Sequence, residues 1–455
     1  MKEHNMIDFW KTNWILILMI ITTSCIKPTV FGSYIEQMPK PDPNITRVFI
    51  DRDGSIYPSG LIKIEDNLLK NDQKVLIDNV PTVLDRGYLH SYFNYSRKEY
   101  YEQLNQYYNI PKQENKSQGW ASLQYAMLEQ ISSQLNKNLA KQSTAGGSNA
   151  TLVVLIHGYN VNQKAGENYE PYMVLEKRVK ENYFADKPVH FLEVYWDGLN
   201  GNIFTIWPYA QANAVFVGLS LRNILNQISK DYPIRIITHS TGAVVATNAL
   251  WNVRAAKGTK GDEMARWQFL KEGENDATNL CFGEMRLDAK NYKTPQHPDL
   301  RLASIAPAQP GLTYYDFLDR TPADPDSVGW YQRIIIGYNN NDFTTSKGLR
   351  FLAKSKAGLG ATSLAVYATE YGNYVYPKIQ KSNNNYKTRS YWIDLYPNRF
   401  FYTRHGLIKY LEQPATADLL NLLFQSDNKD STPPKKGNEI TLAPYINCPD
   451  CNCNY

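Results

Sequence analysis

The stretch Ile234-Arg-Ile-Ile-Thr-His-Ser-Thr-Gly242 joins an apolar run to a segment rich in alanine, and it decides the fold. The run up to Thr238 has the composition of a parallel strand that is buried on both faces. The segment from Gly242 to about 256 is predicted to be a helix. Ser240 is therefore expected on a tight strand-to-helix turn, where small neighbours let the chain turn and expose the hydroxyl. The alternative is that this serine is only a helix N-cap.

Further apolar runs and helical segments alternate on both sides of this stretch. The runs predict strands at Thr151–Ile156, His190–Trp196, Ile234–Thr238, Leu300–Ile305 and Gln332–Gly337, and helices are predicted over 170–183, 209–229, 242–256 and 407–424. This alternation predicts an α/β protein with a doubly wound, mostly parallel sheet. Its functional site is expected at the carboxyl ends of the strands.

The remaining segments divide the chain around an α/β domain over 149–425. Residues 26–148 are predicted to be an N-terminal extension and connector, with short strands after Thr46 and at Lys74–Asp78 and a helix over 119–141. The extension is expected to add strands or a flank to the sheet. Two polar stretches, about 257–299 and 344–390, are too long for simple connections and are interpreted as cap insertions above the site. Residues 426–455 are predicted to be a polar linker and a cysteine-rich tail.

Composition bounds the class of protein. The 455 residues are 43% hydrophobic, enough to bury a sizeable core. The formal charge of +5 comes from 49 basic and 44 acidic residues without a block of Lys or Arg. We therefore expect no nucleic-acid partner.

Residues 1–25 have the pattern of an export signal. A polar start is followed by the apolar run Trp14–Ile21 and then by Thr22-Thr-Ser-Cys25. The run is short for a membrane span and fits the apolar region of a signal peptide. Its end resembles a bacterial lipobox, which implies a lipidated Cys25 and a membrane-anchored lipoprotein of the cell envelope. Secretion without an anchor, a short membrane anchor and a buried cysteine are the alternatives.

The other cysteines do not predict a metal site. Besides Cys25, the chain has Cys281 and a cluster of Cys448, Cys451 and Cys453. Structural zinc sites use four ligands, and no further His or Cys is near the cluster in sequence. A disulfide within the tail, or from the tail to Cys281, is the ordinary alternative in an oxidising compartment.

A second motif lies about 80 residues before Ser240, where Leu155-Ile-His-Gly-Tyr-Asn160 closes a predicted buried strand. Together with Thr238-His-Ser-Thr-Gly242, it resembles the α/β-hydrolase superfamily over about 150–425, particularly lipase- and esterase-like members with a His-Gly-Tyr or His-Gly-Phe loop. Thr238 stands where the usual pattern has its first glycine. The resemblance implies that Ser240 is the nucleophile and that the backbone N–H groups of Tyr159 and Thr241 form an oxyanion hole. His157 is interpreted as a structural histidine that orients this loop.

The base is expected late in the chain, where His405 precedes the helix predicted over 407–424. An imidazole near neutrality suits the task of taking the Ser240 proton and returning it to the leaving group. The other histidines lie in the leader, in the two motifs or where the fold has no catalytic position: His4, His90, His157, His190, His239 and His297.

A carboxylate is needed to orient that imidazole. Asp342 follows the strand predicted over 332–337, and the order Ser240, Asp342, His405 is the order that the superfamily uses. Asp326 and Asp394 are the alternatives, although neither directly follows a strand predicted here.

These residues predict a serine hydrolase that cleaves an ester or related acyl bond through an acyl-enzyme, with no metal or organic cofactor. A small-molecule or lipid-like acyl substrate is the expected partner. Two other interpretations stay open. One is a catalytically silent envelope protein for binding or assembly on a hydrolase scaffold, and the other is a peptidase or thioesterase with the same triad.

Overall fold

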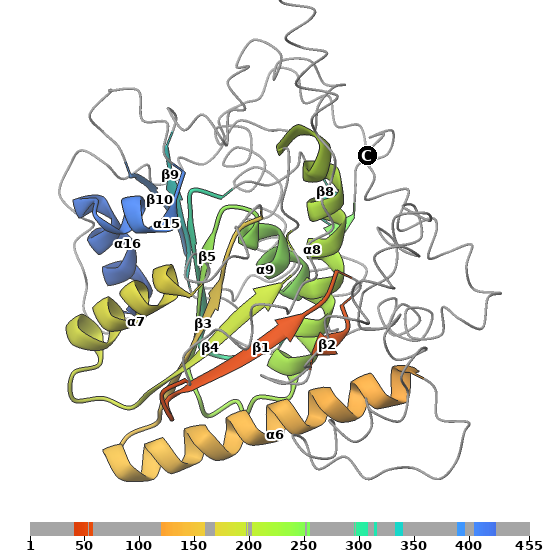
Figure 1. The fold of residues 1–455 in the computed structure, drawn as a ribbon. Coiled ribbons are helices and arrows are strands. Elements are labelled where there is room, and N and C mark those ends of the chain that lie inside the picture. Colours follow the sequence, from red (N-terminus) through yellow and green to blue (C-terminus); the bar gives the residue numbers. More distant parts are fainter. Residues whose placement is uncertain are drawn as a thin grey trace, which may run out of the picture.

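Most of the strands form one large sheet that is parallel apart from an edge strand (Figure 1). The computed structural model describes residues 41–52, 54–57, 120–159, 169–196, 198, 203–250, 253–254, 295, 297–307, 314–315, 333–339, 389–395 and 405–424. Among these, eight strands pair in the order β10-β9-β7-β5-β3-β4-β1-β2, and β2 alone is antiparallel to its neighbour in this sheet. The chain is therefore an α/β protein with a mostly parallel sheet, as the alternating pattern predicts.

The central strands are the apolar runs of the sequence. The strands of the sheet are β1 (Ile45–Ile50), β2 (Ile56–Tyr57), β3 (Thr151–Ile156), β4 (Val189–Trp196), β5 (Ile234–His239), β7 (Leu300–Ile305), β9 (Arg333–Tyr338) and β10 (Arg389–Asp394). Each strand predicted from an apolar run is confirmed within one residue at either end. Every residue of β3, β4, β5 and β7 is buried, because helices cover both faces of the sheet.

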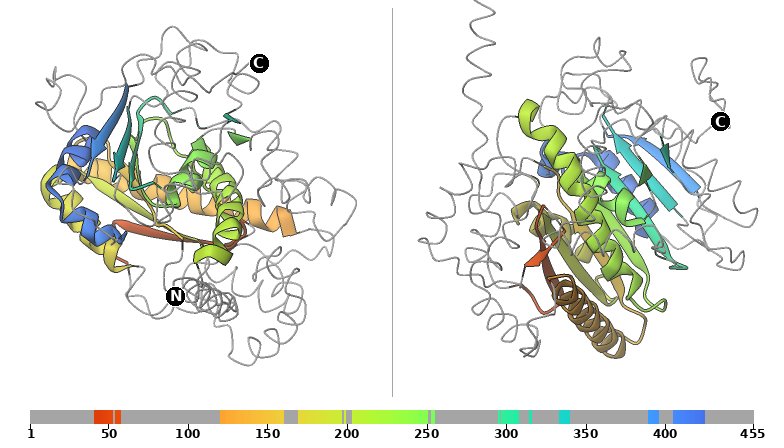
Figure 2. Two further views of the ribbon diagram at one scale, coloured as in Figure 1. Left: turned by 90° about the horizontal axis from the view of Figure 1, so that it is seen from above. Right: turned by 90° about the vertical axis from the view of Figure 1, so that its right-hand side faces the viewer.

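The helices divide between the two faces (Figure 2). One face carries α8 (Ile203–Asn226) and α9 (Gly242–Leu250), and α6 (Trp120–Gly146) packs beside α8 and against β4. The other face carries α7 (Glu170–Tyr183), α15 (Leu407–Leu411) and α16 (Pro414–Phe424). Helices on both faces agree with the predicted doubly wound arrangement.

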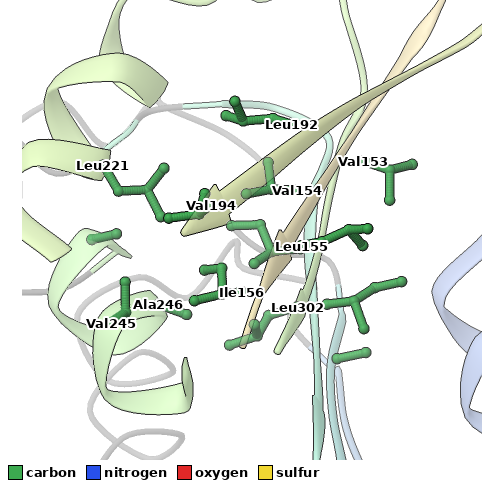
Figure 3. Close-up of a cluster of buried hydrophobic side chains, with 14 of the residues drawn as sticks. Val153, Val154, Leu155, Ile156, Leu192, Val194, Leu221, Val245, Ala246 and Leu302 are labelled. Atoms are coloured by element: carbon green, nitrogen blue, oxygen red, sulfur yellow. The ribbon is translucent and has the colours of Figure 1, made fainter. Parts of the chain in front are cut away.

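The core lies on both sides of β3 (Figure 3). Val154 and Ile156 point toward α8 and α9, whereas Val153 and Leu155 point toward the opposite face. All four side chains are at most 1% exposed. Because full burial of such a side chain contributes about 1.5–3 kcal/mol, this strand anchors the sheet from both faces.

Two predicted helices are shorter than the sequence pattern indicates. The helix predicted over 242–256 ends at Leu250, because Val253–Arg254 forms β6 and pairs with β8 (Tyr314–Tyr315). The helix predicted over 407–424 is two helices, α15 and α16. Pro414 begins the second helix, since its ring is tolerated in a first turn and not in a helix interior.

The N-terminal extension adds strands to the sheet, as predicted. β1 pairs in parallel with β4 along its whole length, from Ile45 opposite Phe191 to Ile50 opposite Trp196. By contrast, β10 was not predicted, and it extends the opposite edge beyond β9.

Several sequence predictions lie outside the described residues. These are the leader with Cys25, the strand at 74–78, the other cysteines, most of both cap insertions, Asp326 and Asp342. Of the helices that the structure describes, none combines the length and the apolar composition needed to cross a bilayer.

Candidate active site

The sheet order places the two sequence motifs next to each other. The chain leaves β3 for β4 on one side and later returns to β5 on the other side of β3. Such a reversal opens a crevice at the carboxyl ends of the two neighbouring strands. The last residues paired between β3 and β5 are Ile156 and Thr238, so the segments that begin at His157 and His239 lie side by side at this end of the sheet.

Ser240 occupies a strained turn directly after β5. Its φ of +53° lies in the left-handed region, which few residues other than glycine adopt. The backbone N–H of Ser240 donates a 3.1 Å hydrogen bond to the carbonyl of Ile305 in the neighbouring strand. A Cβ on Gly242 would lie 2.5 Å from the carbonyl oxygen of Ile156, so a side chain there would collide with β3. The turn therefore has the conformation and the small neighbour that the sequence predicts. The expectation that it exposes the hydroxyl is wrong, because Ser240 is buried at 1% exposure.

Thr238 does not disturb this turn. It is the penultimate residue of β5, it is buried, and its hydroxyl donates to Ser304 Oγ at 3.0 Å. The branched side chain thus lies within the strand, where branched residues pack well.

The Ser240 hydroxyl does not cap helix α9. Among the described residues, Ser240 Oγ has no hydrogen-bond partner although the side chain is only 1% exposed. An N-cap serine would accept a hydrogen bond from the first turn of its helix. A buried polar atom without a partner costs about 1–3 kcal/mol, so this hydroxyl is retained against a stability penalty.

The His157-Gly158 motif lies against this serine. A Cβ on Gly158 would be 2.6 Å from Ser240 Cβ and 3.1 Å from its Oγ. A residue with a side chain would therefore collide with Ser240. The loop after β4 closes the other side, because a Cβ on Gly198 would be 2.9 Å from the Cα of Tyr159.

Main-chain hydrogen bonds occupy both nitrogens of the His157 ring. The N–H of Trp196 donates to Nε2 at 3.2 Å, which leaves the proton on Nδ1, 2.6 Å from the Gly158 carbonyl oxygen. The ring also stacks on Trp196 with centroids 5.8 Å apart. Burial lowers the pKa of His157 to about 4, so the ring is neutral at pH 7. The histidine holds the loop and has no nitrogen left to act as a base.

His405 approaches the turn from the segment before α15. Its ring lies beside that of His239, with centroids 4.8 Å apart and planes 35° apart. The carbonyl oxygen of His405 is 2.8 Å from His239 Nε2. The structure therefore brings His405 into contact with His239, the residue that precedes Ser240, although the two histidines are 166 positions apart in the chain.

The described residues do not complete the predicted triad, because Ser240 Oγ forms no hydrogen bond with His405 and the predicted acid is not among them. Asp342 and Asp326 lie outside them, and the structure describes the chain after β9 only as far as Asn339. Asp394 is the last residue of β10, paired in register with Tyr338. Asp394 thus ends a parallel strand that was not predicted, because β10 lacks a continuous apolar run.

Two contacts of the site were not predicted from the sequence. These are the close approach of Gly158 to Ser240 and the contact between His239 and His405. No local signal marks either of them, since each joins residues far apart in the chain.

The described residues contain no group of three or more His, Cys, Asp or Glu side chains that could hold a metal ion. A hollow of about 560 Å³ lies between α6 and the turn before β5, lined by residues such as Ser132, Lys137 and Tyr232. This hollow is at the amino end of β5, whereas Ser240 follows its carboxyl end.

Comparison of the chain with protein-family models, with curated proteins and with solved structures finds no significant match in any of the three. A functional proposal therefore depends on the geometry of the residues themselves.

Proposed function

We propose that this protein is a serine hydrolase of the α/β-hydrolase type, which cleaves an ester or related acyl bond with Ser240 as its nucleophile. The observation that carries the proposal is the conformation of Ser240. It has a left-handed backbone at the end of a buried parallel strand, and its hydroxyl forms no hydrogen bond among the described residues. Backbone strain and a buried polar group without a partner both reduce stability. They are therefore uncommon elsewhere and are typical of functional sites.

The neighbouring N–H groups support an oxyanion hole. Thr241 immediately precedes α9, so its N–H has no intrahelical acceptor. In the trans peptide between Gly158 and Tyr159, the carbonyl faces the His157 ring and the N–H points the other way. Two preorganised donors of this kind contribute several kcal/mol when charge develops on the carbonyl oxygen.

The reaction would proceed in two halves. Ser240 Oγ attacks the acyl carbon while His405 takes its proton, and the N–H groups of Tyr159 and Thr241 bind the oxyanion. His405 then gives the proton to the leaving group, which leaves an acyl-enzyme. Water then attacks the acyl carbon while His405 takes its proton. The carboxylic acid product departs as Ser240 regains its proton from His405. Asp342 would orient the His405 ring and stabilise its cation, and no cofactor is needed for these steps.

Export as a lipoprotein is the second part of the proposal, and it comes from the sequence of the leader. Cys25→Ala should release the protein from membranes, because the variant cannot be lipidated and the apolar run Trp14–Ile21 is removed with the leader. Membrane fractionation measures this. Unchanged membrane association would indicate an uncleaved anchor instead.

The test of the nucleophile is labelling by a fluorophosphonate probe, which reacts with activated serines. Wild-type protein should be labelled, and Ser240→Ala should not be labelled or turn over substrate. Ser132→Ala is the matched control, because it removes a buried hydroxyl of α6 that lies toward the amino end of β5, whereas Ser240 follows the carboxyl end. A Ser240→Ala variant with more than about a hundredth of wild-type turnover would refute the assignment. A panel of esters, thioesters and peptides then separates an esterase from a thioesterase or peptidase.

A second candidate function has one structural observation in its favour. Ser240 is only 1% exposed, and the hollow lined by the described residues lies at the opposite edge of the sheet. Both features suit a catalytically silent protein for binding or assembly on a hydrolase scaffold. Turnover of a short-chain aryl ester that depends on Ser240 would eliminate this candidate.

A further inference from the structure

His239 joins the proposed nucleophile to the proposed base, and the mechanism above gives it no task. It is the last residue of β5, directly before Ser240, and its Nε2 is 2.8 Å from the carbonyl oxygen of His405. A carbonyl oxygen can only accept, so Nε2 carries the proton and donates it. The donor is thus fixed to the strand that also carries Ser240.

The two imidazole rings are held by a third ring. Tyr410 of α15 is fully buried and lies 6.2 Å from both the His239 ring and the His405 ring, edge-on to the latter. Asn339, which follows β9, donates from Nδ2 to the Tyr410 hydroxyl at 3.3 Å. Segments from β5, from β9 and from the start of α15 therefore meet at this aromatic cluster of His239, His405 and Tyr410.

A loop histidine needs such support to act on a serine. Misplacement of a reacting group by about 1 Å can cost about a hundredfold in rate. The hydrogen bond from His239 fixes the main chain of His405, and the ring contacts restrict its imidazole plane. The hydrogen bond and the contact between the two imidazole rings connect His405 directly to the residue before Ser240.

We propose that His239 is a positioning residue, which holds His405 in reach of Ser240 by donating to its carbonyl and packing against its ring. This inference rests on the proposed function. His239 does not itself exchange a proton with substrate. It aligns the base with the nucleophile, so its loss should slow the chemical step and leave substrate binding nearly unchanged.

The test compares three variants. His239→Phe keeps an aromatic ring and removes the donor, whereas His239→Gln restores an amide N–H near the position of Nε2. His297→Phe is the matched control, because His297 Nε2 lies 2.9 Å from a main-chain carbonyl, that of Ser229, near the amino end of β7. Each variant is measured for the rate of fluorophosphonate labelling, for kcat and KM on a short-chain aryl ester, and for hydrogen exchange of the amides over 405–411.

We expect His239→Phe to lower the labelling rate and kcat at least tenfold, with KM within about twofold and faster exchange over 405–411. His239→Gln should recover most of the rate, and His297→Phe should match wild type in both measurements at a similar loss of thermal stability. Normal labelling of His239→Phe with faster exchange would show a merely structural role and overturn the proposal. Unchanged exchange would show that His239 does not hold the loop. A wild-type protein that takes no label refutes the proposed function, while the exchange data still report on the contact.

Discussion

At the scale of single residues, the candidate site is marked by left-handed backbone conformations at the ends of the neighbouring strands β5 and β7. Among the described residues, Ser240 and Ala306 are the non-glycine residues with positive φ, at +53° and +44°. Each donates its N–H to the adjacent strand, Ser240 to Ile305 at 3.1 Å and Ala306 to Gly337 at 2.8 Å. Such conformations cost about 1–3 kcal/mol each and persist because the surrounding structure determines them.

This strain can be tested without any measurement of activity. Ser240→Gly and Ser240→Ala both lack the hydroxyl, but glycine adopts positive φ without steric cost. We expect the glycine variant to be more stable than the alanine variant by about 1 kcal/mol in urea unfolding. At Ser220, within α8, the same pair should show the opposite order, since glycine destabilises a helix interior by about 1 kcal/mol relative to alanine. Equal stability of the two Ser240 variants would contradict the left-handed turn.

The position of the acid is the second prediction at this scale. Strands lie about 4.8 Å apart, so the end of β9 is about 10 Å from β5 and the end of β10 about 14 Å. Because Asp342 is four residues after β9 in the sequence, we expect it to be nearer to His405 than Asp394 is. Asp342→Asn should therefore lower turnover about 10³- to 10⁴-fold, as loss of the orienting carboxylate does in other triads.

The controls for this prediction are Asp326→Asn and Asp394→Asn, which should each change turnover less than about tenfold. The three variants must be compared at equal folded fraction, because a loop aspartate can also stabilise a turn. If Asp394→Asn loses activity and Asp342→Asn keeps it, the acid belongs to β10, and the roles of Ser240 and His405 remain.

At the scale of elements, the helix α7 buries a carboxyl group against β4. Arg47 of β1 forms an ion pair with Glu193 of β4 at 2.5 Å, and Tyr195 donates to the same carboxylate at 3.0 Å. Glu176 of α7 faces this group. Burial, the charge of Glu193 and a hydrogen bond with Glu193 raise the pKa of Glu176 to about 9, although Arg47 lowers it. Glu176 is therefore protonated in the folded protein at pH 7.

This carboxyl should make stability depend on pH. Between about pH 4.5 and pH 9 the folded state keeps a proton that the unfolded state releases, so stability falls as pH rises, by up to about 1.4 kcal/mol per pH unit. Glu176→Gln removes this slope. The stability of the variant relative to wild type should rise between pH 6 and pH 8 in urea unfolding. Glu181→Gln, on the exposed side of α7, should follow wild type at both values. Parallel profiles for Glu176→Gln and wild type would exclude a protonated Glu176.

The elements also show why sequence reasoning succeeds or fails. β3 and β7 are predicted to the residue, because burial on both faces demands an apolar run that stands out in the sequence. β10, at the sheet edge, has only three aromatic or apolar residues in a row between polar ends and gives no such signal. The end of α9 depends on the pairing of Val253 with Tyr315, a contact between distant segments. Ser240 and His405 could be singled out by motif and order. The contacts of Gly158 with Ser240 and of His239 with His405 arise only when distant segments come together in the fold.

At the scale of the whole molecule, the N-terminal extension is part of the folded unit. β1 continues the sheet beyond β4, and α6 packs on β4 and α8. Gln142 of α6 donates to Asn44 at 2.7 Å and lies 3.0 Å from His190 Nδ1, so partly buried polar contacts also join the helix to the sheet. Side chains from α6, β1 and β2 belong to the same hydrophobic core as those of β3 and β5.

A protein that begins at residue 149 should therefore not fold. Its β4 would become an edge strand whose unpaired N–H and C=O groups invite aggregation. Glu193, now paired with Arg47, would lose that partner, and a carboxylate left without its partner in a buried pair costs about 3–5 kcal/mol. This loss is a large share of a typical stability of about 5–15 kcal/mol, even before the apolar contacts of β1 and α6 are counted.

The measurement is the cooperativity of urea unfolding for the purified protein over 149–455, with a protein that lacks 426–455 as the control. The control keeps every described strand and helix, so it should unfold cooperatively like the full chain. The protein over 149–455 should be insoluble or unfold without a sharp transition. Arg47→Met distinguishes the two causes, because it keeps β1 and removes only the partner of Glu193. If this variant is destabilised by about 3–5 kcal/mol but folds, loss of the ion pair and loss of the N-terminal elements each contribute to the failure of the protein over 149–455. A cooperative transition of the protein over 149–455 near that of the full chain would show instead that β1 and α6 are accessory, and that the sheet is complete from β4 onward.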